Sequence, residues 1–140
     1  MKSRISLTST KARKEFTAEF KLVEKESKDY GENNDCSVKA VAIVSGLSYG
    51  YVRTLFLSKG REHRKPTPRS VTFAVLQELG IVTRQINKTP KTVGRCEKEL
   101  DKAHKFLVFT SNHMLAVSSG EAHCWTRDRQ HRPTSVFRVM

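Results

Sequence analysis

The chain has 140 residues and a formal net charge of +12, from 26 Lys and Arg against 14 Asp and Glu. Hydrophobic residues make up 37% and charged residues 29%, which is the composition of a globular domain and excludes a disordered chain. No stretch approaches the roughly 20 consecutive apolar residues of a membrane-spanning helix, so we expect no membrane partner.

The N-terminal sequence and the cysteines indicate a reducing, cytoplasmic environment. Residues 1–5 lack the apolar segment of a secretory signal. Cys36, Cys96 and Cys124 have no CxxC or similarly short spacing, so we expect free thiols and no metal site. Two of the three are expected to be ordinary buried side chains. A glycine-rich phosphate loop is also absent from the sequence, and no cofactor is expected.

The excess positive charge lies in the second part of the chain. Residues 1–36 carry eight Lys and Arg against seven Asp and Glu, whereas residues 37–140 carry 18 against seven. A basic body of this kind attracts nucleic acid or an acidic protein. No zinc-finger or RRM signature is present, and a solvated loop without a partner is the alternative. The candidate contacts are in the densest basic loop: Arg61, Arg64, Lys65 and Arg69.

The first half of the chain is predicted to be helical. Residues 1–31 are expected to form a polar extension before a domain at 32–140, with a helix over 12–28 because Phe16, Phe20 and Val23 repeat at helical spacing. A buried helix is expected to begin at or just before Cys36 and to end at Gly46, a natural terminator. Two more helices are expected, over 48–58 and from 69 or 70 to 79, separated by a proline-containing loop.

The second half is predicted to be mainly antiparallel strands. Apolar runs separated by turn residues indicate a hairpin around Ser119 and Gly120. Helices followed by an antiparallel sheet give an α+β fold. The expected strands cover 81–86, 105–110, 113–118, 121–126 and 135–140, with a helix over 92–104.

Cys36 is the candidate nucleophile. It follows Asn34 and Asp35, both good N-cap residues, and therefore lies in the first turn of the predicted helix. The unsatisfied N–H groups at a helix N-terminus favour a thiolate there. An ordinary buried cysteine at a helix start is the alternative.

His113 is the candidate general base. It opens an apolar strand directly after Ser111 and Asn112, where its side chain can face a cleft between sheet and helix. An imidazole in that place can accept the thiol proton and later deliver it to a leaving amine. A partly exposed histidine at a strand edge is the alternative.

Three segments resemble the small papain-like cysteine peptidases of bacteria and their phages. They are Asn-Asp-Cys-Ser-Val-Lys-Ala at 34–40, Gly-Leu-Ser-Tyr at 46–49 and Asn-His-Met-Leu-Ala-Val at 112–117. Asn112 stands where that family usually has glycine. The resemblance spans roughly residues 33–126. It implies a papain-like fold in which a cysteine at a helix N-terminus packs on a C-terminal sheet that carries the histidine.

The third catalytic position departs from the family pattern. The family usually has an Asp or Asn after the glycine turn, to orient the histidine ring. Strand alternation places Cys124 on the face of His113 at that position, and a thiol is a poor orienting group. His123 would take the place if the segment is aligned with papain itself, and Asp128 is close enough in sequence to substitute. A dyad without a third member, or a scaffold that has lost catalysis, are the other outcomes.

The resemblance implies hydrolysis of a peptide or isopeptide bond, or acyl transfer to an amine, through a thioester at Cys36. The Cys36 N–H and the Asn34 side chain would hold the oxyanion, although Asn34 could instead only cap the helix. The alternative function is an inactive scaffold that binds nucleic acid or a host protein. A phage-encoded member would act in the host cytoplasm.

Overall fold

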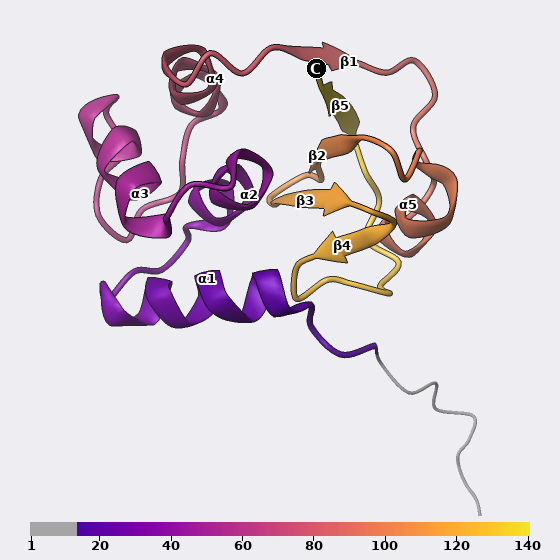
Figure 1. The fold of residues 1–140 in the computed structure, drawn as a ribbon, viewed down its shortest axis with the longest axis horizontal. Helices are drawn as coiled ribbons and strands as arrows, with labels where there is room; N and C mark the ends of the chain where they lie inside the picture. The colour runs from indigo at the N-terminus through magenta and orange to yellow at the C-terminus, as the bar shows by residue number, and fades with distance from the viewer. Residues whose placement is uncertain (1–13) are drawn as a thin grey trace, which may run out of the picture.

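The computed structural model describes residues 14–140 and has an α+β fold in which four helices precede the first strand of the sheet (Figure 1). The sheet is antiparallel throughout, so the predicted fold class is confirmed at this level. The helices and strands are α1 (Ala18–Asp29), α2 (Cys36–Ser45), α3 (Tyr49–Ser58), α4 (Arg69–Glu78), β1 (Thr83–Gln85), α5 (Val93–Glu99), β2 (Lys105–Phe109), β3 (Met114–Ser118), β4 (Glu121–His123) and β5 (Ser135–Val139).

Three predicted boundaries need correction. The first helix begins at Ala18 and not at residue 12, because the Thr17 hydroxyl accepts the Phe20 N–H and caps it; residues 12 and 13 lie outside the described residues. The helix expected to reach residue 104 ends at Glu99, since Leu100 has an extended backbone. The strand expected to reach residue 126 ends at His123, where the chain turns.

The five strands are ordered β1-β5-β2-β3-β4. The predicted hairpin is present, with Ser118 paired with Glu121 across the turn. The last strand lies inside the sheet and pairs with β1 on one side and with β2 on the other. The strand order therefore places β5, near the C-terminus, between two strands from the middle of the chain.

Apolar side chains cover both faces of the sheet, and this explains the nearly continuous hydrophobic runs in β2 and β3. Side chains alternate along a strand, so neighbours point to opposite faces. Leu107 and Met114 belong to the core beneath α1–α4, whereas Val108 and Leu115 belong to a second core beneath α5. The helices of the first half thus form one layer, and α5 forms the other (Figure 1).

Helix α1 is part of this domain and not an extension of it. Phe20 is 2% exposed and Val23 is 5% exposed, and both belong to the core that α2 shares with the sheet. Among the described residues, those before the expected boundary at residue 31 therefore share one core with those after it.

A buried carboxylate organises the segment before α2. The Glu32 side chain is fully buried and accepts two hydrogen bonds from the Arg61 guanidinium, at 2.9 and 2.9 Å. Arg53 and His63 also contact it, at 2.7 and 3.1 Å, and the Arg64 N–H donates to it at 3.0 Å. Burial alone would raise the pKa of Glu32, but these partners outweigh burial and lower the pKa well below its ordinary value.

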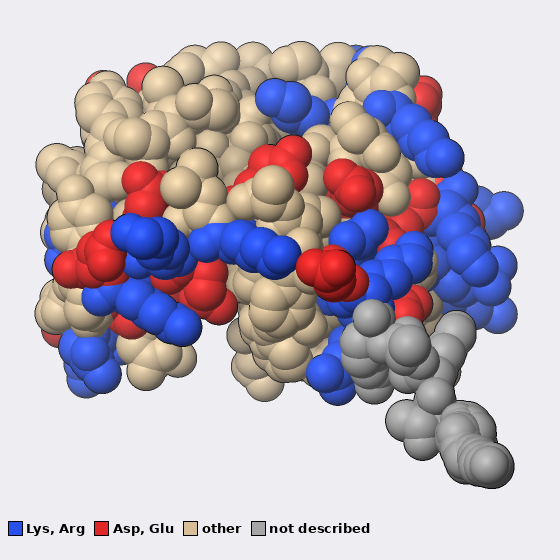
Figure 2. Space-filling model, turned by 60° about the horizontal axis from the view of Figure 1, so that its bottom comes forward, with Lys and Arg blue, Asp and Glu red and all other residues tan. Residues whose placement is uncertain are grey.

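Only some of the basic side chains expected in this loop are therefore exposed at the surface. Arg61 is 3% exposed because its guanidinium lies against Glu32, so Arg61 is not available to a partner. Arg64, Lys65 and Arg69 remain exposed. On the face shown in Figure 2, basic and acidic side chains alternate, and basic ones gather at the right-hand end, where α5 lies in Figure 1.

Among residues 14–140, no helix has both the length and the apolar composition needed to cross a bilayer.

Replacing Glu32 should strongly destabilise the fold. Glu32→Gln leaves the Arg61 charge buried without a carboxylate, so the free energy of unfolding should fall by about 3–5 kcal/mol. Because the folded pKa of Glu32 is lowered from its ordinary 4.5, the wild-type contribution is fully present above that pH and is lost as the pH falls below it. Urea denaturation followed by circular dichroism measures both effects.

The matched control is Asp29→Asn, which breaks an ion pair with Lys25 whose side chains are 76% and 63% exposed. This change should alter the free energy of unfolding by less than about 0.5 kcal/mol. Equal effects of the two substitutions would contradict a structural role for the Glu32 cluster.

Candidate active site

Cys36 is the first residue of α2, as predicted, and its side chain is half-buried. Asp35 occupies the N-cap position, but its side chain does not cap the helix. Its carboxylate instead accepts hydrogen bonds from the hydroxyls of Ser27 and Tyr49. Since Asp35 is turned away, it does not compete for the N–H groups of the first helical turn beside Cys36.

Asn34 ties the start of α2 to the basic loop. Its backbone is left-handed, with φ 53°, and its side-chain Nδ2 donates to the Arg64 carbonyl at 3.1 Å. Asn34 also lines the cavity described below, and its amide has a second N–H. The expected role as an oxyanion donor is compatible with this position, whereas the alternative, helix capping, does not match it, because Asp35 holds the N-cap position and Asn34 bonds to Arg64.

His113 lies at the end of the turn between β2 and β3, one residue before β3 begins. The turn is closed by Thr110, whose N–H donates to the His113 carbonyl at 2.8 Å. The Thr110 hydroxyl lies 3.4 Å from the same carbonyl. The backbone of His113 is therefore fixed by the hairpin, and its ring projects from the end of the sheet toward α2.

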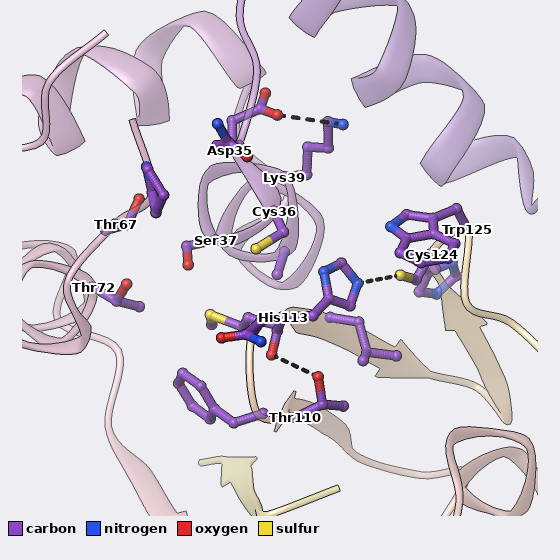
Figure 3. A pocket seen from close by; sticks show the side chains of 18 of the residues that line it. Asp35, Cys36, Ser37, Lys39, Thr67, Thr72, Thr110, His113, Cys124 and Trp125 are labelled. Atoms are coloured by element: carbon purple, nitrogen blue, oxygen red, sulfur yellow. Dashed lines mark hydrogen bonds and ion pairs between the residues drawn. The ribbon is translucent and has the colours of Figure 1, made fainter. Parts of the chain in front are cut away.

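Cys36 and His113 line the same cavity, which has a volume of about 830 Å³. Figure 3 shows the two side chains next to each other, the cysteine on α2 and the imidazole below it. Cys124 and Trp125 form the wall on the other side of the imidazole. The two residues that the sequence singled out, 77 positions apart, thus meet at one site.

The hydrogen bond of the imidazole runs to the second thiol. His113 Nε2 lies 2.6 Å from Cys124 Sγ. Among the hydrogen bonds of residues 14–140, none joins the His113 ring to Cys36. Burial, together with the nearby charges of His131 and Lys39, lowers the pKa of His113 to about 4. The ring is consequently neutral at pH 7.

Cys124 occupies the place of the orienting residue, as strand alternation predicted. Its sulfur accepts hydrogen bonds from the Thr126 hydroxyl at 3.0 Å and from the Thr126 N–H at 3.4 Å. Burial raises the pKa of Cys124 to about 11, so the group is a neutral thiol. A neutral thiol can fix the direction of the His113 ring, but it cannot offset the charge of an imidazolium.

His123, one of the two alternative orienting residues, makes its hydrogen bonds away from His113. His123 is 3% exposed, and its ring nitrogens contact the hydroxyls of Thr17 and Ser118, each at 2.7 Å. It therefore joins the start of α1 to the end of β3. The backbone of Asp128 lies against Gly94 in α5, and Asp128 is not among the described residues that line the cavity. Cys124 is the residue whose side chain contacts the Nε2 atom of His113.

Two neighbours of the site were not predicted to contribute to it. Trp125 is 46% exposed, and its ring lies 5.6 Å from that of His113 and 5.5 Å from that of His131, centre to centre. Lys39 contacts Glu24 at 2.6 Å and Asp35 at 3.4 Å. Its position three residues after Cys36, on the same side of the helix, was the available signal.

Comparison with protein-family models, with curated proteins and with solved structures finds no match for this chain. Its function is therefore inferred from the geometry and chemistry of this site. Within residues 14–140, no group of three or more His, Cys, Asp or Glu side chains is arranged to hold a metal ion.

Giving His113 a charged partner should raise its pKa. In Cys124→Asp, a carboxylate replaces the thiol beside Nε2, and an opposite charge at this distance raises a histidine pKa by about one to three pH units. The pKa of His113 should therefore rise from about 4 toward the ordinary value of 6.5. NMR titration of the imidazole C–H signals measures it.

Cys124→Ser is the control, because its hydroxyl is similar in size to the thiol and is uncharged. The pKa of His113 should stay low in this variant. The same pKa in the Asp and Ser variants would contradict the contact between residue 124 and the imidazole.

Proposed function

We propose that this chain is a papain-like thiol hydrolase that cleaves a peptide or isopeptide bond through a thioester at Cys36. The observation that carries the proposal is the shared cavity of Cys36, at the first turn of α2, and His113, before β3. A thiol at a helix N-terminus and an imidazole from a separate element are the parts that nucleophilic catalysis on an acyl group needs.

In the proposed reaction, the Cys36 sulfur attacks the carbonyl carbon while His113 takes the thiol proton. Nδ1 is the ring nitrogen for this step, because Nε2 is already occupied by Cys124. The imidazolium then gives its proton to the leaving amine, and the C–N bond breaks. Water, deprotonated by His113, hydrolyses the thioester and restores the thiol. The Cys36 N–H and the Asn34 amide are the candidate donors to the oxyanion.

Cys124 sets an upper limit on the rate of this reaction. A carboxylate in its place would stabilise the imidazolium that forms during both steps, whereas the neutral thiol does not. Loss of the charged orienting group lowers the rate of such enzymes by about 10⁴-fold in the best-studied triad. We therefore expect slow turnover, with an imidazole that is in its base form at pH 7.

Cys36 should be the most reactive thiol of the chain. Cys96 and Cys124 are 0% and 2% exposed, and burial raises their pKa values to about 12 and about 11. In the folded protein, iodoacetamide should alkylate Cys36 about tenfold faster than either, or more. Peptide mass spectrometry at timed intervals gives the three rates. Equal rates would sink the hydrolase proposal.

A second candidate function is an inactive scaffold that binds an acidic macromolecule. It is favoured by the neutral partner of His113 and by the exposed side chains of Arg64 and Lys65. Binding of this kind rests on contacts of basic side chains with phosphates and weakens steeply with salt.

Cleavage of a blocked-peptide library and binding of a fluorescent DNA duplex separate the two functions. If the chain is a hydrolase, Cys36→Ala should lower the cleavage rate by about 10³-fold or more, whereas Cys96→Ala should leave the rate unchanged. If the chain is only a binding protein, Cys36→Ala should leave DNA affinity unchanged and Arg64→Ala should weaken it. Cleavage that survives in Cys36→Ala would contradict the thioester route.

A further inference from the structure

One end of the cavity is lined by hydroxyl groups from three separate segments. Ser37 lies next to Cys36 in the first turn of α2, Thr67 precedes α4, and Thr72 lies within α4. In Figure 3 their hydroxyls are turned toward the space between them, beside Cys36. A group bound in this space would therefore lie close to the thiol.

Two of these hydroxyls have no hydrogen-bond partner among the described residues. Thr72 is 0% exposed, and its Oγ1 is buried and unpaired, as is Oγ1 of Thr67. A threonine hydroxyl in a helix usually bonds to the carbonyl four residues earlier. Here that carbonyl, of Pro68, already accepts the N–H groups of Val71 and Thr72, at 3.0 and 3.3 Å. Buried polar groups are rarely left unpaired, so these hydroxyls need a further partner, such as a ligand group or an ordered water.

A positive charge stands beside these hydroxyls. Arg69 lies three residues before Thr72, on the same side of α4, and both line the cavity. Its guanidinium lies 4.0 Å from the centre of the Phe109 ring and donates one hydrogen bond to Ser135, at 3.2 Å. A guanidinium has five N–H donors, so others remain for a ligand.

The carboxylates that line the cavity lie at its opposite end, where they share one cation. Glu24 and Asp35 both contact Lys39, at 2.6 and 3.4 Å. Figure 3 shows the Asp35–Lys39 contact on the far side of Cys36 from Thr72. The hydroxyl-lined end therefore offers hydrogen-bond donors and a cation, which suit an anion.

We propose that this end of the cavity receives an acidic side chain of the substrate, with its carboxylate held by Ser37, Thr67, Thr72 and Arg69. A carboxylate accepts several hydrogen bonds at once and satisfies the unpaired hydroxyls. The inference rests on the proposed function, because it assigns a substrate class to the same site. The positive charge of the whole chain also favours acidic substrates.

The test measures binding without cleavage, in the Cys36→Ala protein. The probes are blocked tetrapeptides with one glutamate moved through the four positions of an alanine background, and the matched glutamine set. NMR titration of the labelled protein should show one glutamate peptide binding about tenfold more tightly than its glutamine counterpart. The shifted amide signals should include those of Ser37, Thr67 and Thr72.

Variants of α4 test whether these side chains cause the preference. In the Cys36→Ala background, Thr72→Val keeps the shape but removes the hydroxyl, and Arg69→Gln removes the charge. Each should reduce the preference for glutamate to about threefold or less. Thr72→Val should also fold at least as stably as its parent, because it removes an unpaired buried hydroxyl.

The matched control is Thr54→Val on α3, whose hydroxyl bonds to the Gly50 carbonyl at 3.0 Å. It should leave the preference unchanged. Equal binding of both peptide sets, or no binding by either, overturns the inference. Cleavage by the wild-type chain without a preference for glutamate overturns it but leaves the hydrolase intact. A preference for glutamate in binding, without any cleavage by the wild-type chain, supports the carboxylate site but contradicts the hydrolase.

Discussion

The geometry of the site depends on the burial of two carboxylates just before α2. Glu32 is held by Arg61 and its neighbours, and Asp35 accepts hydrogen bonds from Ser27 and Tyr49. Both interactions fix the short segment from which Cys36 starts its helix. Charges taken out of water are tolerated only when their partners are in place. The position of the thiol is thus set by electrostatic constraints from α1, α3 and the loop after α3.

In the proposed enzyme, Cys36 and His113 would form the dyad and Cys124 would be a weak third member. The hairpin fixes His113, and Cys124 fixes the direction of its ring, but no charge on Cys124 supports protonation. Because no negative charge lies beside it, the His113 imidazole stays neutral and can accept a proton. The same lack of a negative charge raises the energy of the imidazolium that forms when it does. Catalysis at such a site would rely on substrate positioning, in which the hydroxyl-lined end of the cavity would share.

Local patterns predicted the parts of this site that depend on periodicity. The start of α2 followed from Asn34 and Asp35, and the placement of Cys124 on the same side as His113 followed from strand alternation. Pairing between distant segments was not predictable in this way. The sequence marks Arg61 only as one basic residue in a basic loop, and its burial depends on Glu32, 29 positions earlier.

The position of β5 between β1 and β2 has a consequence for how the chain folds. During synthesis, the strands that face α2 emerge before the strand that completes the sheet. Until then, the edge of β2 has no partner on one side, and Phe109 lacks its contact with Phe137. Non-local strand pairing of this kind is slow and exposes an aggregation-prone edge. The edge of β2 therefore stays unpaired on that side until β5 has been made.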